Sequence, residues 1–165
     1  MQGELFPDDR LTRAGASTVT PSLLGRYAEF MVCAQLCRAG YHATHVDGHG
    51  FDVVLTTERR SFTVQVKSSA VIVGGWCHWR VGKHTHSGGA GGLGRGYYKK
   101  RSLLPTDADL LALFHVAYET TTLVPIPSRG VSNVKLSVVQ VQRARLDART
   151  VQRAISATER AGGVC

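Results

Sequence analysis

The first part of the chain carries apolar side chains at helical spacing. From Leu23 to Leu36 they cover most of the circumference of a helix. Thr20 suits the N-cap, Pro21 the first turn, and Gly40 the residue just after the helix. Because so little of this helix is polar, we expect it to be largely buried.

The pattern then changes to the alternation and the short apolar runs that are typical of strands. A polar segment, 58–60, suits a hairpin turn between two of them, and Asp147 suits the N-cap of a last helix over 148–161. The expected strands are Tyr41–Val46, Phe51–Thr57, Ser61–Ser68, Asp109–Val116 and Thr120–Ile126. This order of elements predicts an α/β fold with a central mixed β-sheet flanked by α-helices.

Two segments lack such a pattern. Residues 1–20 are polar, and we expect a flexible N-terminal tail there. Residues 74–96 are rich in glycine, which loses the most entropy on ordering, so they predict a mobile loop. The remainder of the chain, 21–165, has the size of a single domain.

Composition narrows the classes of function. The chain has 165 residues, of which 43% are hydrophobic, and its apolar runs are too short to span a membrane. The N-terminus lacks a secretory pattern and the four cysteines include no CxxC pair, so we expect a cytoplasmic protein with reduced thiols. Twenty Lys and Arg against 12 acids give a net charge of +8, which predicts a polyanionic partner, nucleic acid first.

Candidate chemistry lies on the second and third expected strands. Strand alternation puts Gln65 and Lys67 on one face of the third strand, and Val64 and Val66 on the other. Asp52 stands at the start of the neighbouring strand. A carboxylate, an amide oxygen and an ammonium would then form an exposed polar cluster suited to a hard cation. The alternative is an ordinary amphipathic hairpin on which Asp52 and Lys67 form a surface ion pair.

One further acid and two histidines are candidates for the same region. Glu29 is one of few charges in the helix that we expect to be buried, so it needs either a metal or a basic partner. His45 and His49 precede Asp52 in the sequence. We interpret both histidines as solvated loop residues rather than as phosphate ligands.

With these residues the chain resembles the PD-(D/E)xK nuclease superfamily, which includes Holliday junction resolvases and restriction endonucleases. The family pattern is a helix glutamate, a strand aspartate, and an acid-x-lysine on the hairpin partner. It maps onto Glu29, Asp52, Gln65 and Lys67. Phe51 replaces the proline of the pattern, and Gln65 replaces its acid, as in a PD-(D/Q)xK variant. The loss of one negative charge should weaken metal binding unless Glu29 compensates for it.

The resemblance implies a restriction-endonuclease-like fold and a metal-dependent phosphodiester hydrolase. Mg²⁺, with Mn²⁺ as a substitute, would be held by Asp52, Gln65, the Val66 carbonyl and Glu29, and would neutralise charge on the scissile phosphate. Lys67 would orient the attacking water or stabilise the developing charge. The expected catalytic residues are therefore Glu29, Asp52, Gln65 and Lys67.

The resemblance also implies DNA as the substrate and a homodimer, since cutting two strands requires two sites. A chain this short has little room for a separate sequence-reading domain. Branched or structured DNA, as cut by a Holliday junction resolvase, is therefore our first expectation. Homing or restriction-type endonuclease activity is one alternative. A non-catalytic DNA-binding protein that assists recombination or repair is the alternative from another class.

Basic residues outside this site predict a DNA-binding surface. Arg145, Arg149 and Arg153 recur every four residues and would form one stripe on a helix. The end of the glycine-rich segment mixes cations, which bind phosphates, with tyrosines, which stack on bases. Its expected DNA contacts are Arg95, Tyr97, Tyr98, Lys99, Lys100 and Arg101. A solvated helix face and a plain linker are the alternatives.

The N-terminal tail carries one short motif. Gln2, Leu5 and Phe6 fit a Gln-x-x-Leu-Phe pattern that is similar to peptides docking on the bacterial sliding clamp. Leu5 and Phe6 would enter an apolar pocket while Gln2 hydrogen-bonds at its rim. We therefore predict the clamp as a further partner.

Overall fold

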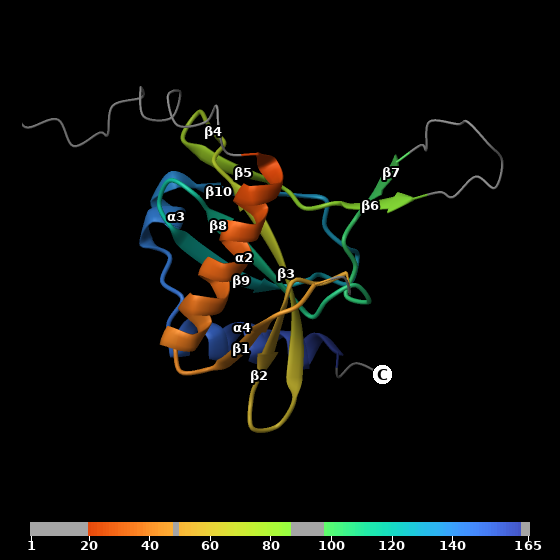
Figure 1. The fold of residues 1–165 in the computed structure, drawn as a ribbon, viewed down its shortest axis with the longest axis vertical. Coiled ribbons are helices and arrows are strands. Elements are labelled where there is room, and N and C mark those ends of the chain that lie inside the picture. Colours follow the sequence, from red (N-terminus) through yellow and green to blue (C-terminus); the bar gives the residue numbers. More distant parts are fainter. Residues whose placement is uncertain (1–19, 48–49, 87–97, 163–165) are drawn as a thin grey trace, which may run out of the picture.

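A five-stranded mixed sheet forms the centre of the protein (Figure 1). The computed structural model describes residues 20–47, 50–86 and 98–162. In spatial order, the strands are β1 (His42–His45), β2 (Val53–Thr56), β3 (Ser61–Ser69), β8 (Leu110–His115) and β9 (Thr120–Pro125). All five lie where the sequence predicts strands, so the predicted mixed sheet is confirmed.

Pairing within this sheet is antiparallel except between β3 and β8. These two strands run parallel, with Val64 opposite Leu110 and Ser69 opposite His115. β1, β2 and β3 form an antiparallel meander, and β9 returns antiparallel to β8. Every residue of β8 is buried, which is typical of a central strand covered on both faces.

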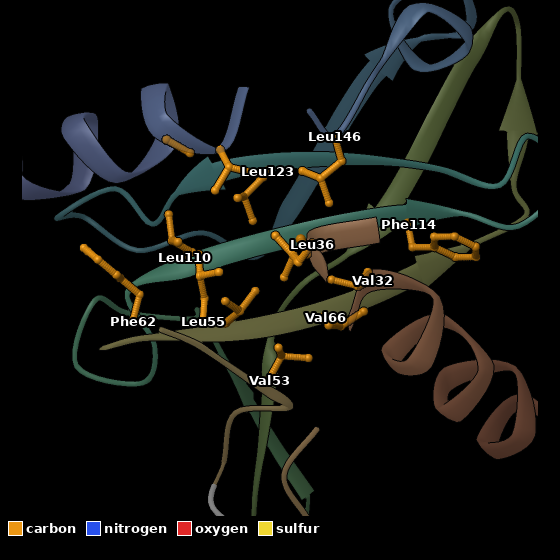
Figure 2. Close-up of a cluster of buried hydrophobic side chains, with 14 of the residues drawn as sticks. Val32, Leu36, Val53, Leu55, Phe62, Val66, Leu110, Phe114, Leu123 and Leu146 are labelled. Carbon is orange, nitrogen blue, oxygen red and sulfur yellow. The ribbon is translucent and has the colours of Figure 1, made fainter. Parts of the chain in front are cut away.

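Two helices, α2 (Pro21–Arg38) and α4 (Ala148–Gly162), cover one face of the sheet. Figure 2 shows the core on this side, where Val32 and Leu36 of α2 pack with Val66 and Leu110 of the sheet. The helix after Asp147 is confirmed with its cap, because the Thr150 amide donates to Asp147 Oδ1 at 2.8 Å.

α2 begins and ends where the sequence predicts. Thr20 Oγ1 accepts a hydrogen bond from the Leu23 amide at 3.3 Å, and Gly40 just beyond the helix has a φ of +90°. The expectation that this helix is largely buried is wrong, because the sheet covers just one side of it. Leu23 and Phe30 are 59% and 55% exposed.

A second layer covers the other face of the sheet. It consists of a small sheet in the order β10 (Asn133–Ser137), β5 (Trp76–Arg80) and β4 (Ile72–Val73), with the short helix α3 (Val138–Arg143) beside it. Trp79 is its largest buried side chain, and its indole nitrogen donates to the Phe114 carbonyl at 3.1 Å. Leu111 and Leu113 of β8 face this second core.

The mobile loop predicted at 74–96 is wrong over its first half. β5 lies there, and β6 (Lys83–His86) follows and pairs with β7 (Tyr98–Arg101) in a two-stranded ribbon that stands away from the body in Figure 1. The buried Cys77 and Trp79 alternate with exposed or half-buried neighbours, which is the strand pattern that the glycines conceal. The remainder of the predicted loop, 87–97, lies outside the described residues.

The N-terminal tail lies outside the described residues except for Thr20, which caps α2. Within the described ranges, no helix is both long enough and apolar enough to cross a membrane.

Candidate active site

The candidate site is built on the middle of β3, where side chains alternate between the two layers. Val64 and Val66 are buried in the core beneath α2 and α4. Gln65 and Lys67 face the opposite layer, since they are in register with Leu111 and Leu113 of β8. The prediction that Gln65 and Lys67 lie on the face of the strand opposite to the two valines is confirmed. The predicted exposure of the amide is wrong, because Gln65 is 5% exposed beneath the second layer.

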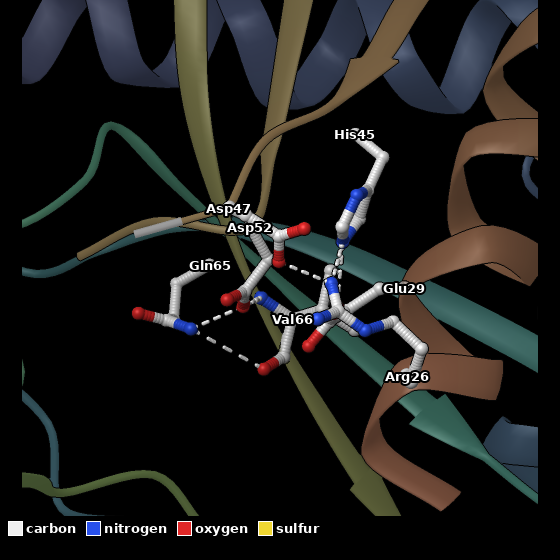
Figure 3. Close-up of polar contacts among 7 residues, drawn as sticks. All are labelled: Arg26, Glu29, His45, Asp47, Asp52, Gln65 and Val66. Carbon is white, nitrogen blue, oxygen red and sulfur yellow. Dashed lines mark hydrogen bonds and ion pairs between the residues drawn. The ribbon is translucent and has the colours of Figure 1, made fainter. Parts of the chain in front are cut away.

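Asp52 reaches the same point of β3 from the residue just before β2. Its backbone amide donates to the Val64 carbonyl at 3.0 Å, which extends the β2–β3 ladder by one residue. Its Oδ2 atom accepts hydrogen bonds from the Val66 amide, at 2.7 Å, and from Gln65 Nε2 (Figure 3). The hairpin therefore brings together the carboxylate and the amide that the sequence singled out.

The Gln65 amide is turned with its nitrogen toward Asp52. Gln65 Nε2 donates to the Asp52 carboxylate and, at 3.5 Å, to the Val66 carbonyl. Two oxygen acceptors thus converge on a group that bears hydrogens, which is the arrangement of acceptors around a cation. The sequence predicts the amide oxygen, rather than the nitrogen, at this position. A half-turn of the amide about its terminal bond would bring that oxygen toward the two acceptors.

Burial raises the pKa of the Asp52 carboxyl above its ordinary value. The hydrogen bond from the Val66 amide and the positive charge of Lys67 oppose this effect, whereas the negative charge of Glu29 adds to it. Lys67 is therefore close enough to act on Asp52 electrostatically. A cation bound at this carboxylate would relieve the unfavourable burial of its charge.

Glu29 lies on α2 in contact with basic side chains. Its Oε2 atom is 3.3 Å from Arg26 Nη1 and 2.7 Å from His45 Nε2. Arg26 also contacts His45 at 2.8 Å and forms an ion pair with Asp47 (Figure 3). The sequence predicts that Glu29 needs either a metal or a basic partner. The structure shows basic partners, Arg26 and His45.

Sequence reasoning missed this network around Glu29. It does not single out Arg26, and it places His45 in a solvated loop, whereas His45 lies on β1 and is largely shielded from solvent. The available signal was the predicted strand Tyr41–Val46, which already contains His45. The pairing itself was not visible, because α2 and β1 meet through tertiary packing.

The donor set suits a hard cation in its chemistry. Asp52 offers a carboxylate, Val66 a carbonyl, and Gln65 an amide oxygen if the amide turns, and these are oxygen ligands of the type that Mg²⁺ binds. Within the described ranges there is no group of three or more His, Cys, Asp and Glu side chains arranged to hold a metal. Any metal here would therefore depend on the amide and backbone oxygens as well as on carboxylates.

The residues predicted to bind DNA lie on different elements of the structure. Arg101, at the end of β7, donates two hydrogen bonds of 2.6 Å to Asp107, so an internal ion pair occupies its guanidinium. Arg149 and Arg153 are exposed on α4. Arg145 is not part of their helix; it precedes α4, and its guanidinium donates to backbone carbonyls at 3.1 and 2.9 Å.

Of the remaining residues predicted to bind DNA or the clamp, some lie on β7 and the others lie outside the described residues. Tyr98, Lys99 and Lys100 lie on β7, in register with His86, Thr85 and His84 of β6. Arg95 and Tyr97, and the clamp-binding residues Gln2, Leu5 and Phe6, lie outside the described residues, so their roles stay predictions.

Comparison with known proteins gives a similarity in fold but none in sequence families. No protein-family model and no curated protein matches the sequence. Among solved structures, the chain is similar to a bacterial homing endonuclease, I-Ssp6803I. The TM-score is 0.62 at 18% sequence identity, and the alignment covers 87% of this chain and 96% of that one. The similarity therefore concerns the whole fold.

Proposed function

We propose that the protein is a metal-dependent DNA endonuclease that hydrolyses phosphodiester bonds. The observation that carries this proposal is the convergence of the Asp52 carboxylate and the Val66 carbonyl on the Gln65 amide, with Lys67 beside them. The net charge of +8 and the fold shared with a homing endonuclease support DNA as the substrate.

Each residue has a distinct part in the proposed reaction. Asp52, the Val66 carbonyl and the Gln65 amide oxygen would hold Mg²⁺, or Mn²⁺ in its place. When bound, the ion supplies charge neutralisation at the phosphate and a lowered pKa of a ligated water. Lys67 orients the attacking water and stabilises charge that develops on the phosphate. Glu29 adds negative potential near Asp52 and thereby favours a cation there.

The substrate follows from the same observations. The neighbour's description as a homing endonuclease favours that alternative, and so linear duplex DNA, over the branched DNA that the sequence resemblance put first. A homodimer is part of the proposal, because two strands require two sites.

Cleavage assays on linear, flapped, single-stranded and four-way DNA, with Mg²⁺, Mn²⁺ or a chelator, test this function. Asp52→Asn and Lys67→Met should each lower the cleavage rate about 100-fold or more, since each removes charge stabilisation at the reacting phosphate. Glu58→Gln and Arg59→Met, at exposed positions of the β2–β3 turn, are matched controls that should cut as the wild type does.

Two outcomes would contradict the assignment. Full activity of Asp52→Asn and Lys67→Met would show that the chemistry lies elsewhere. DNA binding without cleavage of any substrate, under every metal condition, would favour the non-catalytic accessory protein.

A further inference from the structure

One side of α2 carries a row of uncharged side chains that stay at least partly exposed. Two of them also contact the sheet region, because the Tyr27 ring lies edge-on to Phe114 and its hydroxyl donates to Glu119, and Cys37 Sγ lies 3.9 Å from the Ala43 carbonyl. Leu23 is 59%, Tyr27 38% and Phe30 55% exposed, and Ala34 and Cys37 are exposed as well. We call these five residues the outer seam of α2. In Figure 1, α2 lies at the front of the molecule, with the sheet behind it.

The spacing of the outer seam indicates what kind of surface would cover it. Successive members are four, three, four and three residues apart, which is the repeat that lines up side chains between two packed α-helices. The opposite side of α2 is already occupied, since Ala28, Val32 and Leu36 pack in the core. The apolar side chains of this helix therefore lie on two sides. One side packs on the sheet, and the other has the spacing to pack on a second helix.

The sizes of the seam residues favour a second copy of the same helix in antiparallel orientation. The N-terminal half holds the large Leu23 and Tyr27, and the C-terminal half the small Ala34 and Cys37. An antiparallel pair centred on Phe30 sets Leu23 opposite Cys37 and Tyr27 opposite Ala34. Large residues then face small ones, as close packing requires. A parallel pair would set large against large and small against small.

Charge points to the same orientation. Arg26 and Arg38 flank the outer seam, and a parallel pair would bring each cation level with its own copy. In the antiparallel pair, the two Arg26 residues are separated along the axis by eight residues, or about 12 Å. DNA is a poor occupant of the seam, because none of its five members is a cation and the neighbouring Arg26 already pairs with Glu29 and Asp47.

We propose that the protein forms a two-fold symmetric dimer through antiparallel pairing of the outer seam of α2, with the axis at Phe30. The Phe30 ring lies 4.8 Å from the ring of His45, which itself contacts Glu29. The axis therefore passes beside the Glu29 network of both copies. This interface rests on the homodimer of the proposed function and gives it a contact surface. A monomer that cuts DNA would overturn the interface alone, and a dimer that cuts no DNA would overturn the proposed cleavage alone.

Sedimentation equilibrium of the full chain tests the interface. Phe30→Glu should raise the dimer dissociation constant about 30-fold or more, as expected for a central aromatic anchor. Val139→Glu is the matched control, because Val139 is also an exposed helix residue, at 52% exposure, and lies outside the seam. It should dimerise as the wild type does. Circular dichroism should show the same helix content in both variants.

A protein that sediments as a monomer at every concentration would overturn the proposal and leave the seam to a helix of another protein. Equal weakening of the dimer by Phe30→Glu and Val139→Glu would also overturn it.

Thiol crosslinking tests the orientation. In a Cys33→Ser, Cys165→Ser background, Leu23→Cys should give a covalent dimer with a short bismaleimide, through Cys37 of the second copy. Adding Cys37→Ser should abolish the product, since the two positions 23 then lie about 21 Å apart. Efficient crosslinking of Cys37 to itself, with Leu23 intact, would indicate a parallel pair and overturn the antiparallel arrangement.

Discussion

At the scale of single residues, Gln65 supplies the Asp52 carboxylate with a hydrogen-bond donor from within the protein. A carboxylate at this position would repel Asp52 inside a buried pocket, and one of the two acids would stay protonated. The amide instead donates a hydrogen bond to Asp52. In the sequence, the exchange of acid for amide is visible as a loss of negative charge. The structure shows that the amide also supplies a hydrogen-bond donor to the half-buried Asp52 carboxylate.

His115 is a second residue whose surroundings have a measurable consequence. It is fully buried, stacked on Tyr118 and edge-on to Trp79, and neither ring nitrogen has a hydrogen-bond partner in the part of the chain that the structure describes. Burial lowers the pKa of this histidine below its ordinary value. The folded protein therefore holds it neutral.

Stability should thus depend on pH through His115. As pH falls, the histidine takes up a proton in the unfolded chain before it does so in the folded protein. The free energy of unfolding therefore decreases below about pH 6.5. His115→Phe should raise the free energy of unfolding by about 1 kcal/mol at pH 7.5. The advantage should widen toward pH 5 in urea unfolding curves. His42→Phe, at an exposed position of β1, is the control, and an advantage of His115→Phe that does not change with pH would contradict this account.

At the scale of elements, an ion pair at the end of β7 ties the ribbon of β6 and β7 to the body. Arg101 ends β7 and donates two hydrogen bonds to Asp107, and Asp107 also accepts a hydrogen bond from the Leu104 amide at 2.9 Å. The sequence predicts Arg101 as a DNA contact. Its two-point attachment also makes it a structural anchor for the ribbon, because a planar guanidinium fixes direction as well as distance. Its contact with DNA stays a prediction.

Removing the anchor should loosen the ribbon alone. Arg101→Ala and Asp107→Ala should each speed amide hydrogen exchange in β6 and β7, while β3 and β8 stay protected. The double variant should be no worse than the more severe single one, since both remove the same interaction. Additive effects in the double variant would show that the two residues act separately.

The sequence predicts elements well where the signal is local. β2, β3 and the turn between them follow from alternation and a polar turn, and this hairpin alone brings Asp52, Gln65 and Val66 together. β5 was missed because glycines on either side hid its alternating pattern. The contact of Arg26 with His45 joins α2 to β1 across 19 residues, and no local pattern specifies such packing.

At the scale of the whole molecule, two layers with separate cores enclose one sheet, and the chain carries a net charge of +8. Arg149 and Arg153 are exposed one turn apart on α4, so they extend this charge along a helix that otherwise packs on the sheet. A surface of this kind binds phosphates without regard to sequence.

The salt dependence of DNA binding should report whether α4 contacts DNA. Removing one cation from a phosphate lowers the slope of log K against log salt by about 0.9, so Arg149→Gln with Arg153→Gln should lower it by about 1.8. Arg59→Gln with Arg129→Gln removes the same charge from exposed turns and should change the slope less. Equal slopes for the two double variants, measured by fluorescence anisotropy, would show that α4 does not contact DNA.

The parallel pairing of β3 with β8 bears on when the protein becomes competent during its synthesis. Asp52, Gln65 and Lys67 leave the ribosome early and close together, but the strand that carries two of them has β8 as its second neighbour. Until residue 115 has emerged, β3 is an uncovered edge. The candidate site is thus complete only after β8 has emerged, and a nascent or truncated product ending before β8 would carry its residues without the framework that holds them.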